Sequence, residues 1–344
     1  MIHAGIIGAT GYAGVELYRL LLSHPEVSVS GISSRSFLGQ NIEDIYPNLS
    51  QFSHATLVSE DEVIQASDVV FASLPHGLSE NIAKKCQDAN VAFIDLGADF
   101  RLDDESAYKE WYKENYNHPA LHDISVYGLP ELNREKIKAS RLIGNPGCYP
   151  TAVSLALYPA LSNHLCEAMG IIVDAKSGVT GAGRETTQNT HFPECNETFA
   201  AYKVGAHRHT PEIEQTLTQM ASEKVCITFV PHLLPINRGI LATIYAAKSQ
   251  NQTLESIHGL YADFYRDEPF VRICPLGTCA NVKNVRLSNF CDISLHEDAH
   301  TGRLIIVSAI DNMVKGAAGQ AIQNMNLICG LEETSGLTFI APAF

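Results

Sequence analysis

Short apolar runs alternate with amphipathic stretches over the first half of the chain. Strand-like runs occupy residues 3–7, 27–32, 68–72, 91–96 and 142–144. Between them, residues 13–23 and 78–87 place apolar side chains at the spacing of a helix face. Alternation of strands and helices favours a parallel sheet that is covered by helices, so the sequence predicts a doubly wound α/β domain at the N-terminus.

The second half of the chain has a different pattern. A predicted helix at 151–161 precedes strand-like segments at 170–175, 225–230, 239–247, 281–287, 290–295 and 303–309. Consecutive strands without intervening helices favour an α+β domain with a mixed or antiparallel sheet. Residues 312–330 are predicted as one long helix, which we expect to return to the first domain. The predicted domains are therefore 1–147, completed by 312–344, and 148–311.

A glycine-rich loop follows the first predicted strand. Gly8, Gly11 and Gly14 stand in a GxxGxxG pattern directly before a predicted helix, with Thr10 and Tyr12 between them. Such glycines permit a tight turn and a close approach of the backbone to a pyrophosphate at the helix N-terminus. We interpret the loop as a dinucleotide site in a Rossmann-like domain; the alternative is a tight strand-to-helix turn without a ligand.

The end of the second predicted strand indicates which dinucleotide is bound. Enzymes that use NAD usually carry Asp or Glu there, whereas this chain has Ser33, Ser34 and Arg35. Hydroxyl groups and a guanidinium suit the 2′-phosphate of NADP, unless Arg35 simply lies on a solvated loop. Ser73 and Pro75 follow the third predicted strand, where loops approach the cofactor, although a plain turn is the alternative.

Composition excludes several classes of protein. The 344 residues carry 24 basic and 38 acidic side chains, a formal net charge of −14, and they form no basic stripe that would bind nucleic acid. No uninterrupted apolar run is long enough for a membrane helix, and no export signal precedes the first strand. The nine cysteines are odd in number and lack CxxC spacing, which favours reduced thiols and a cytoplasmic location.

One cysteine stands at a junction between a strand and a helix. Cys148 follows Gly147 and precedes Pro150, a residue that fits the first turn of a helix. A helix N-terminus favours negative charge, so this position is expected to lower the thiol pKa and raise the thiolate fraction. Cys148 is the predicted nucleophile, against the alternative of a buried structural thiol.

Four segments together resemble a known family. They are residues 8–14 (GATGYAG), 144–151 (GNPGCYPT), 177–184 (SGVTGAGR) and 205–213 (GAHRHTPEI). In this combination the chain resembles N-acetyl-gamma-glutamyl-phosphate reductase, in the longer of its two forms, over nearly its whole length. That family is similar in fold and chemistry to aspartate-semialdehyde dehydrogenase.

The resemblance implies an oxidoreductase of arginine biosynthesis. Such an enzyme reduces N-acetyl-glutamyl 5-phosphate with NADPH to the semialdehyde and phosphate, through a thioester on a cysteine. The family pattern implies that Ser177, Gly178 and Asn312 contact the cofactor. We also expect a homo-oligomer, either a dimer or a tetramer.

The segment around residue 207 supplies the other predicted site residues. His207 and His209 alternate, so in an extended segment they would share a face, and one of them is the predicted acid/base. The resemblance favours His207. The anionic substrate requires cations, for which Arg184 and Arg208 are the candidates. Tyr202 either touches the substrate or belongs to the core.

Three alternatives remain open at this point. Within the enzyme class, the substrate could be that of aspartate-semialdehyde dehydrogenase. His191 and Cys195 are four residues apart and could join the later histidines in a zinc hydrolase, but residues 192–194 should break the helix that would align them, and no metal is expected. A module that senses NADP without chemistry would leave the predicted thiol without a role.

Overall fold

A computed structural model describes residues 1–249 and 252–343, and it divides the chain into two compact units. Unit 1 comprises Met1–Pro146 and Ala317–Thr338, and unit 2 comprises Gly147–Gly316 with the chain end from Phe339. The predicted domain ranges also contain residues 250–251 and 344, which lie outside the described residues.

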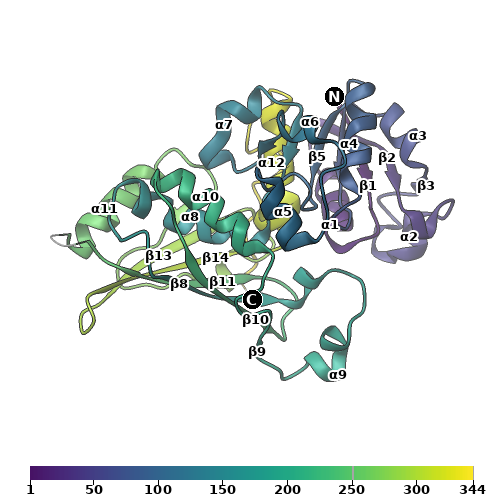
Figure 1. Cartoon of the computed structure of the whole chain (residues 1–344). Helices are drawn as coiled ribbons and strands as arrows, with labels where there is room; N and C mark the ends of the chain where they lie inside the picture. Colours follow the sequence, from purple (N-terminus) through teal and green to yellow (C-terminus); the bar gives the residue numbers. More distant parts are fainter. Residues whose placement is uncertain (250–251, 344) are drawn as a thin grey trace. The chain divides into compact units, whose positions relative to one another are not determined.

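Unit 1 is built on a sheet of seven strands in the order β3-β2-β1-β4-β5-β7-β6 (Figure 1). All of the neighbouring pairs are parallel. The strands are β1 (Ile2–Ile7), β2 (Val27–Ser33), β3 (Leu57–Val58), β4 (Val69–Ala72), β5 (Ala92–Asp95), β6 (Val126–Tyr127) and β7 (Leu142–Gly144). The predicted doubly wound parallel sheet is thereby confirmed.

The helices of unit 1 connect these strands, except for α12 (Gly319–Ile328), which follows unit 2 in the chain. The others are α1 (Tyr12–Leu21), α2 (Ile42–Ile45), α3 (Glu60–Gln65), α4 (Ser79–Asp88), α5 (Glu105–Tyr112), α6 (Pro119–His122) and α7 (Pro130–Lys138). Local sequence determines where some of them begin. At α3, for example, the Ser59 hydroxyl accepts the N–H of Glu62 while the Glu62 carboxylate accepts the N–H of Ser59, so two unpaired donors are satisfied.

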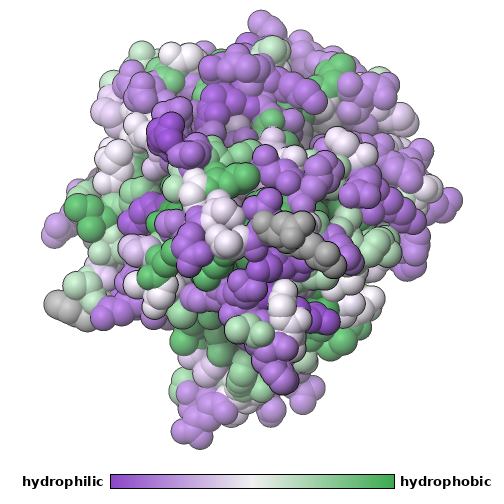
Figure 2. Space-filling model, turned by 90° about the vertical axis from the view of Figure 1, so that its left-hand side faces the viewer, coloured by the Kyte–Doolittle hydropathy of each residue, from purple (hydrophilic) through white to green (hydrophobic). Residues whose placement is uncertain are grey.

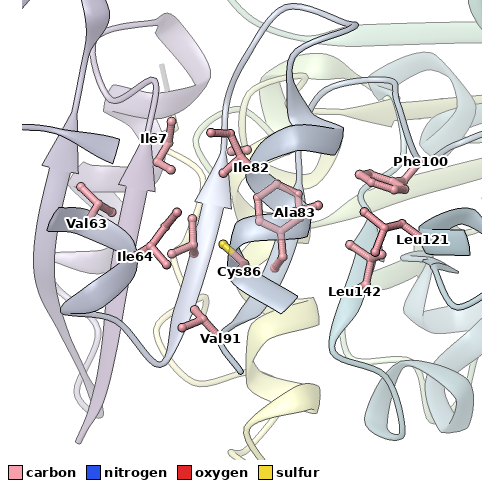
Figure 3. Close-up of a cluster of buried hydrophobic side chains, with 13 residues drawn as sticks. Ile7, Val63, Ile64, Ile82, Ala83, Cys86, Val91, Phe100, Leu121 and Leu142 are labelled. Atoms are coloured by element: carbon pink, nitrogen blue, oxygen red, sulfur yellow. The ribbon is translucent and has the colours of Figure 1, made fainter. Parts of the chain in front are cut away.

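An apolar cluster lies under the helices on one face of this sheet (Figure 3). Side chains of the strands, such as Ile7 and Leu142, belong to this cluster together with Val63 of α3 and Ile82 of α4. Burying each such side chain contributes about 1.5–3 kcal/mol. Cys86 of α4 belongs to the same cluster, and its burial raises the thiol pKa to about 12, as expected for a cysteine that serves as a small core residue.

The last helix returns to unit 1, as predicted. The α12 helix, drawn in yellow in Figure 1, packs against α1 and α7. The Asn326 side chain lies 3.1 Å from His24 Nε2. Arg134 of α7 forms an ion pair of 2.8 Å with Glu333, directly after the helix.

The prediction of one continuous helix over 312–330 is wrong at its start. Val314–Ala318 form a π-helical turn, and α12 begins only at Gly319. The Gly316 N–H donates to the carbonyl of Asp311, five residues earlier, and the Asp311 carboxylate accepts the N–H of Met313. These hydrogen bonds widen the turn, which no apolar periodicity could reveal.

Unit 2 contains a second sheet of seven strands, ordered β12-β13-β14-β11-β8-β10-β9. The strands are β8 (Ile171–Gly178), β9 (Ala200–Ala201), β10 (Ile227–Leu234), β11 (Ile240–Ala247), β12 (Val271–Ile273), β13 (Cys291–Asp298) and β14 (Arg303–Ile310). The pairs β8/β10 and β12/β13 are parallel and the others antiparallel, so the predicted mixed sheet is confirmed.

The strand predicted at 281–287 is absent. Val282–Asn284 form a 3-10 turn, and the Asn281 side chain accepts the N–H of Lys283 across 2.9 Å. Asn commonly diverts the backbone into a turn in this way. Leu287 has a positive φ of 61°, which also ends any extended run.

Helices cover one face of the second sheet. They are α8 (Cys148–Ser162), α10 (His209–Ala221) and α11 (Leu254–Phe264), whereas the short helix α9 (Phe192–Cys195) lies apart from the sheet, on the segment between β8 and β9 (Figure 1). The α8 helix is largely buried and packs on α10, β11 and β14. Along β8, Ile171 and Val173 are buried, whereas Ile172 and Asp174 of the opposite face are not. One face of the sheet is therefore core and the other is open.

One face of the molecule is mainly polar. Figure 2 shows a face on which hydrophilic side chains predominate and hydrophobic ones form small scattered groups. Among residues 1–249 and 252–343, no helix has the length and apolar character that crossing a membrane requires.

Candidate active site

The glycine loop of unit 1 has two positions that require glycine. Gly8 has a φ of +86°, and a Cβ there would lie 2.3 Å from the carbonyl oxygen of Ser73. A Cβ on Gly14 would lie 2.2 Å from the carbonyl oxygen of Gly8. At Gly11, the N-cap of α1, the nearest atom to a Cβ would be 3.5 Å away. Gly11 is partly exposed at the N-terminus of α1, where an anion can be bound.

Hydrogen bonds join this loop to the ends of the neighbouring strands. The carbonyl of Ser33 accepts the N–H groups of Gly8 and Ala9, at 3.0 and 2.9 Å. The hydroxyls of Thr10 and Ser34 lie 2.7 Å apart and are buried. The structure thus brings together four of the residues predicted to bind the cofactor, namely Gly8, Thr10, Ser33 and Ser34.

Arg35 and Tyr12 lie nearer the solvent. Arg35 follows Ser34 in a 3-10 turn, and its side chain is 59% exposed. Its Nε donates to Glu60 across 2.9 Å. Tyr12 begins α1 and is 38% exposed.

Ser73 lies beside the same loop. It leaves β4 with its N–H donating to the carbonyl of Ile7 across 2.8 Å, and its own carbonyl faces Gly8. Pro75 belongs to the turn that follows, which ends at Leu78, directly before α4.

In unit 2, Cys148 is the first residue of α8, at the junction that the sequence predicted. Gly147 is the N-cap, and its N–H donates to the buried carboxylate of Glu212 across 2.8 Å. The thiol is partly exposed. Gly316 of the π-helical turn passes so close that a Cβ there would lie 2.8 Å from the Cβ of Cys148. A larger residue at position 316 would displace the thiol.

Two histidines and two tyrosines form an aromatic group next to the helix start. The ring of Tyr149, adjacent to Cys148 in the chain, lies 5.6 Å from that of His207 and 5.9 Å from that of His209. Tyr202 lies 5.5 Å from His207, and its hydroxyl is 3.3 Å from that of Tyr149. His207, His209 and Tyr202 thus surround Tyr149, which directly follows the predicted nucleophile Cys148.

The environment of His207 keeps its ring neutral. Burial lowers its pKa to about 4, and the positive charges of Lys203 and Arg208 act in the same direction. The N–H of His209 donates to His207 Nδ1 across 3.1 Å, which places the proton of the neutral ring on Nε2.

The local conformation differs from the expected extended segment. Residues 203–206 form turns, and α10 begins at His209 with Arg208 as its N-cap. The two histidines nevertheless lie side by side, with their ring centroids 4.8 Å apart, because the helix start folds the chain back on itself.

Ser177, Gly178 and Asn312 lie together at the end of β8. Ser177 is buried, and a Cβ on Gly178 would meet the carbonyl oxygen of Asn237 at 2.7 Å. The buried Asn312 accepts the N–H of Gly239 at 2.7 Å and donates to the hydroxyl of Thr180 at 3.0 Å. Asn312 therefore holds the loop that follows β8.

The two predicted substrate arginines differ in placement. Arg184 lies in an exposed segment directly after Gly183, whose φ is +86°. Arg208 is partly buried at the start of α10, where its charge acts on His207.

The helix break predicted at residues 192–194 falls instead at His191, which stays outside the helix as its extended N-cap residue. Phe192–Cys195 form a single turn, α9, because Pro193 occupies the first turn, where a proline is tolerated. In the parts of the chain that the structure describes, no group of three or more His, Cys, Asp or Glu side chains is arranged to hold a metal ion.

Sequence reasoning missed Glu212 and Gly316. Both contact the start of α8 from positions remote in sequence. Glu212 stands three residues after His209, a spacing that places both on one side of a helix, and this was the available signal.

Comparison with known proteins identifies the class. Residues 3–140 match the semialdehyde dehydrogenase NAD binding domain, and residues 148–312 match the semialdehyde dehydrogenase dimerisation domain. The aspartate semialdehyde dehydrogenase II of Vibrio cholerae complexed with ASA has the same fold, with a TM-score of 0.73 and 16% identity over 96% of this chain and 98% of its own. The enzyme of Candida albicans with NADP has a TM-score of 0.69 and 15% identity, over 96% and 98%. The chain thus has the semialdehyde dehydrogenase fold.

Closer relatives define the family. The N-acetyl-gamma-glutamyl-phosphate reductase of Clostridium beijerinckii is 59% identical over 344 residues, which cover both chains completely. That of Brachyspira hyodysenteriae is 56% identical over 352 residues, again over the full length of both. The chain belongs to the N-acetyl-gamma-glutamyl-phosphate reductase family, which confirms the predicted resemblance and the predicted class of enzyme.

Proposed function

We propose that the chain catalyses the NADPH-dependent reduction of N-acetyl-γ-glutamyl phosphate to N-acetylglutamate semialdehyde and phosphate, in arginine biosynthesis. The observation that carries the proposal is the placement of Cys148 at the N-terminus of α8, next to the Tyr149, Tyr202, His207 and His209 group. Relatives that share the whole length of the chain carry the name of this reaction.

Cys148 is the proposed nucleophile. The positive end of the α8 dipole favours its thiolate form. The sulfur attacks the acyl carbon, the bond from carbon to the phosphate oxygen breaks, phosphate leaves and a thioester remains on Cys148. NADPH, when bound, supplies the hydride that reduces this thioester.

His207 is the proposed acid/base. Its Nε2 carries the proton of the neutral ring and donates it, as a hydrogen bond, to the acyl oxygen when negative charge develops there. When the C–S bond breaks and the aldehyde forms, the acyl oxygen loses its negative charge, the proton stays on Nε2 and the Cys148 thiolate is regenerated. His209 fixes the tautomer and the orientation of His207 through its own N–H.

Arg208, Arg184 and Tyr202 are proposed to bind the anionic substrate. Guanidinium groups recognise carboxylates and phosphates through paired hydrogen bonds. Burial raises the pKa of Tyr202 to about 12, so its hydroxyl remains a donor.

Unit 1 is proposed to bind NADP. Thr10 and Tyr12, with the three loop glycines, would receive the pyrophosphate, while Ser33, Ser34 and Arg35 would receive the 2′-phosphate. Ser73 and Pro75 would lie along the cofactor. In unit 2, Ser177, Gly178 and Asn312 remain predicted cofactor contacts.

The open face of the second sheet is the proposed subunit interface. It contains a hollow of about 600 Å³. Apolar and charged side chains line it together, namely Ile172, Asp174, Val230, His232, Tyr245 and Arg303. Since residues 148–312 match a dimerisation domain, we propose a homo-oligomer, a dimer or a tetramer, working in the cytoplasm.

The test is a substrate comparison in the reverse direction. Purified protein should reduce NADP in the presence of phosphate and N-acetylglutamate semialdehyde, and much more slowly with aspartate semialdehyde. Aspartate semialdehyde is the informative competitor because enzymes that act on it share the fold. A preference for aspartate semialdehyde would overturn the substrate assignment, and absence of both activities would overturn the proposed reaction.

A further inference from the structure

The α4 helix of unit 1 begins without a local cap. Its N-cap residue, Leu78, has no side chain that can accept a hydrogen bond, yet the N–H groups of the first turn require acceptors. The helix follows directly on the turn that carries Ser73 and Pro75.

Asp99, from the loop after β5, supplies the missing acceptor. Its Oδ2 accepts the N–H of Ser79, the first residue of α4, across 2.8 Å. Its Oδ1 accepts the N–H of Gly77 across 2.7 Å. The side chain is completely buried, so these hydrogen bonds to a carboxylate are shielded from water.

Tyr108 of α5 completes the arrangement. Its hydroxyl donates to Asp99 Oδ1 across 2.9 Å, and it is buried in an apolar cluster that includes Tyr112. The ring of Tyr112 lies 5.5 Å from that of His76, which belongs to the same turn as Gly77. The Asp99 carboxylate and α5 therefore both hold the turn that contains His76 and Gly77.

The turn is also held at its other end and has little freedom. The Ser73 carbonyl lies against Gly8 of the glycine loop. Gly77 has a φ of +83°, and a Cβ there would lie 2.1 Å from the Glu114 carboxylate. Asp95 also holds the start of α4, because its buried carboxylate accepts a hydrogen bond from the Ser79 hydroxyl across 2.6 Å.

We propose that Asp99 and Tyr108 are positioning residues for the dinucleotide: they hold the turn from Ser73 to Leu78 in the conformation that receives the cofactor beside the glycine loop. This inference rests on the proposed function of unit 1 as an NADP-binding unit. Neither residue needs to touch the cofactor, since each acts through the backbone of the turn.

The variants Tyr108→Phe and Asp99→Asn test this role. Tyr108→Phe removes one hydroxyl and keeps the ring. Asp99→Asn replaces one acceptor oxygen by a donor that opposes a backbone N–H. Because these hydrogen bonds hold the turn that receives the cofactor, we expect the Kd for NADPH to rise roughly tenfold in each variant, while kcat at saturating NADPH changes little.

The matched control is Tyr116→Phe. Tyr116 packs in the same aromatic cluster, but its hydroxyl donates to the carbonyl of Leu102, 2.6 Å away, and not to Asp99. It should destabilise the fold to a similar extent without changing NADPH binding. The measurements are NADPH fluorescence titration, steady-state kinetics, and amide hydrogen exchange at residues 77–79, which should accelerate in Asp99→Asn.

The outcomes separate the two proposals. If the wild-type protein binds NADPH and both variants bind it with unchanged Kd, the positioning role is overturned and the proposed function stands. An equal loss of binding in Tyr116→Phe would also overturn it, because the effect would then be general destabilisation. If the wild-type protein binds no dinucleotide, the proposed function itself fails, and the inference with it.

Discussion

The backbone N–H of His209 donates a hydrogen bond to Nδ1 of His207, and this single contact distinguishes two histidines that their alternating positions in the sequence do not tell apart. His207 is oriented and its free nitrogen is Nε2, whereas His209 acts through its backbone. Tyr149 contacts both rings and is the residue after Cys148, so the pair is tied to the start of α8.

His207→Asn should lower kcat by about 10²–10⁴, the usual contribution of a positioned acid/base. Since the pKa of His207 is lowered to about 4, the wild-type ring stays neutral down to that pH, and activity should show no His207-dependent decline between pH 8 and 5. The measurement is the pH profile of kcat, with the exposed His54→Asn as control. A variant with wild-type kcat would remove His207 from the reaction.

Cys148→Ser should abolish turnover while NADPH binding persists, because a hydroxyl at the helix start is a much weaker nucleophile than a thiolate. Activity and NADPH titration are measured on the same preparation. The control is Cys279→Ser, which changes an exposed thiol and should keep full activity. Substantial residual turnover in Cys148→Ser would exclude Cys148 as the nucleophile.

Glu212→Ala should slow both turnover and alkylation of Cys148 by iodoacetamide. The buried carboxylate anchors the N–H of Gly147, and its loss leaves that donor unsatisfied next to the nucleophile, at a cost of about 1–3 kcal/mol. Glu214→Ala is the matched control, because Glu214 is on the same helix and accepts the N–H of Ile227 across 2.9 Å. Equal effects in both variants would indicate helix destabilisation alone.

Arg35→Asp should shift cofactor preference from NADP towards NAD. A guanidinium bound to a 2′-phosphate contributes about 1.5–3 kcal/mol, so NADPH selectivity should fall roughly tenfold or more. Arg35→Ala is the companion variant, and it should weaken NADPH binding while leaving NADH binding unchanged. The ratio of kcat/KM for the two cofactors is the measurement. An unchanged ratio would contradict the role of Arg35 in binding the 2′-phosphate and would leave it only the ion pair with Glu60.

The sequence predicted those features whose signal is local. Strand and helix alternation gave the parallel sheet of unit 1, and Gly147 with Pro150 marked the helix start at Cys148. The strand expected at 281–287 failed because one Asn side chain redirects the backbone.

The parts of the site that the sequence did not predict depend on contacts between residues far apart in the chain. Glu212 reaches Gly147 across 65 positions, and Asp99 reaches Gly77 across 22, without any periodic pattern. Side chains that satisfy a backbone N–H of another segment leave no trace in hydrophobic periodicity. Such contacts could not be predicted without the fold.

Asp95 should make the stability of the protein depend on pH. Burial, followed by the charge of Asp99, raises its pKa to about 7, although Arg101 and hydrogen bonds from Ser79 and Gly97 act in the opposite direction. An unfolded Asp has a pKa near 3.9, so between about pH 4 and 7 the folded state binds more protons than the unfolded state. The contribution of Asp95 to the free energy of unfolding must therefore fall as the pH rises through this range.

Asp95→Asn isolates this contribution, because the amide approximates the protonated carboxyl and does not titrate. Urea unfolding of both proteins at pH 5, 6, 7 and 8 gives the difference in their free energies of unfolding, in which the shared titrating groups cancel. The variant should gain stability relative to the wild type as the pH rises from 5 to 7, and the difference should level off near pH 8. A difference that is constant from pH 5 to 8 would mean that Asp95 is ionised throughout and that its neighbours, not a proton, stabilise its buried charge.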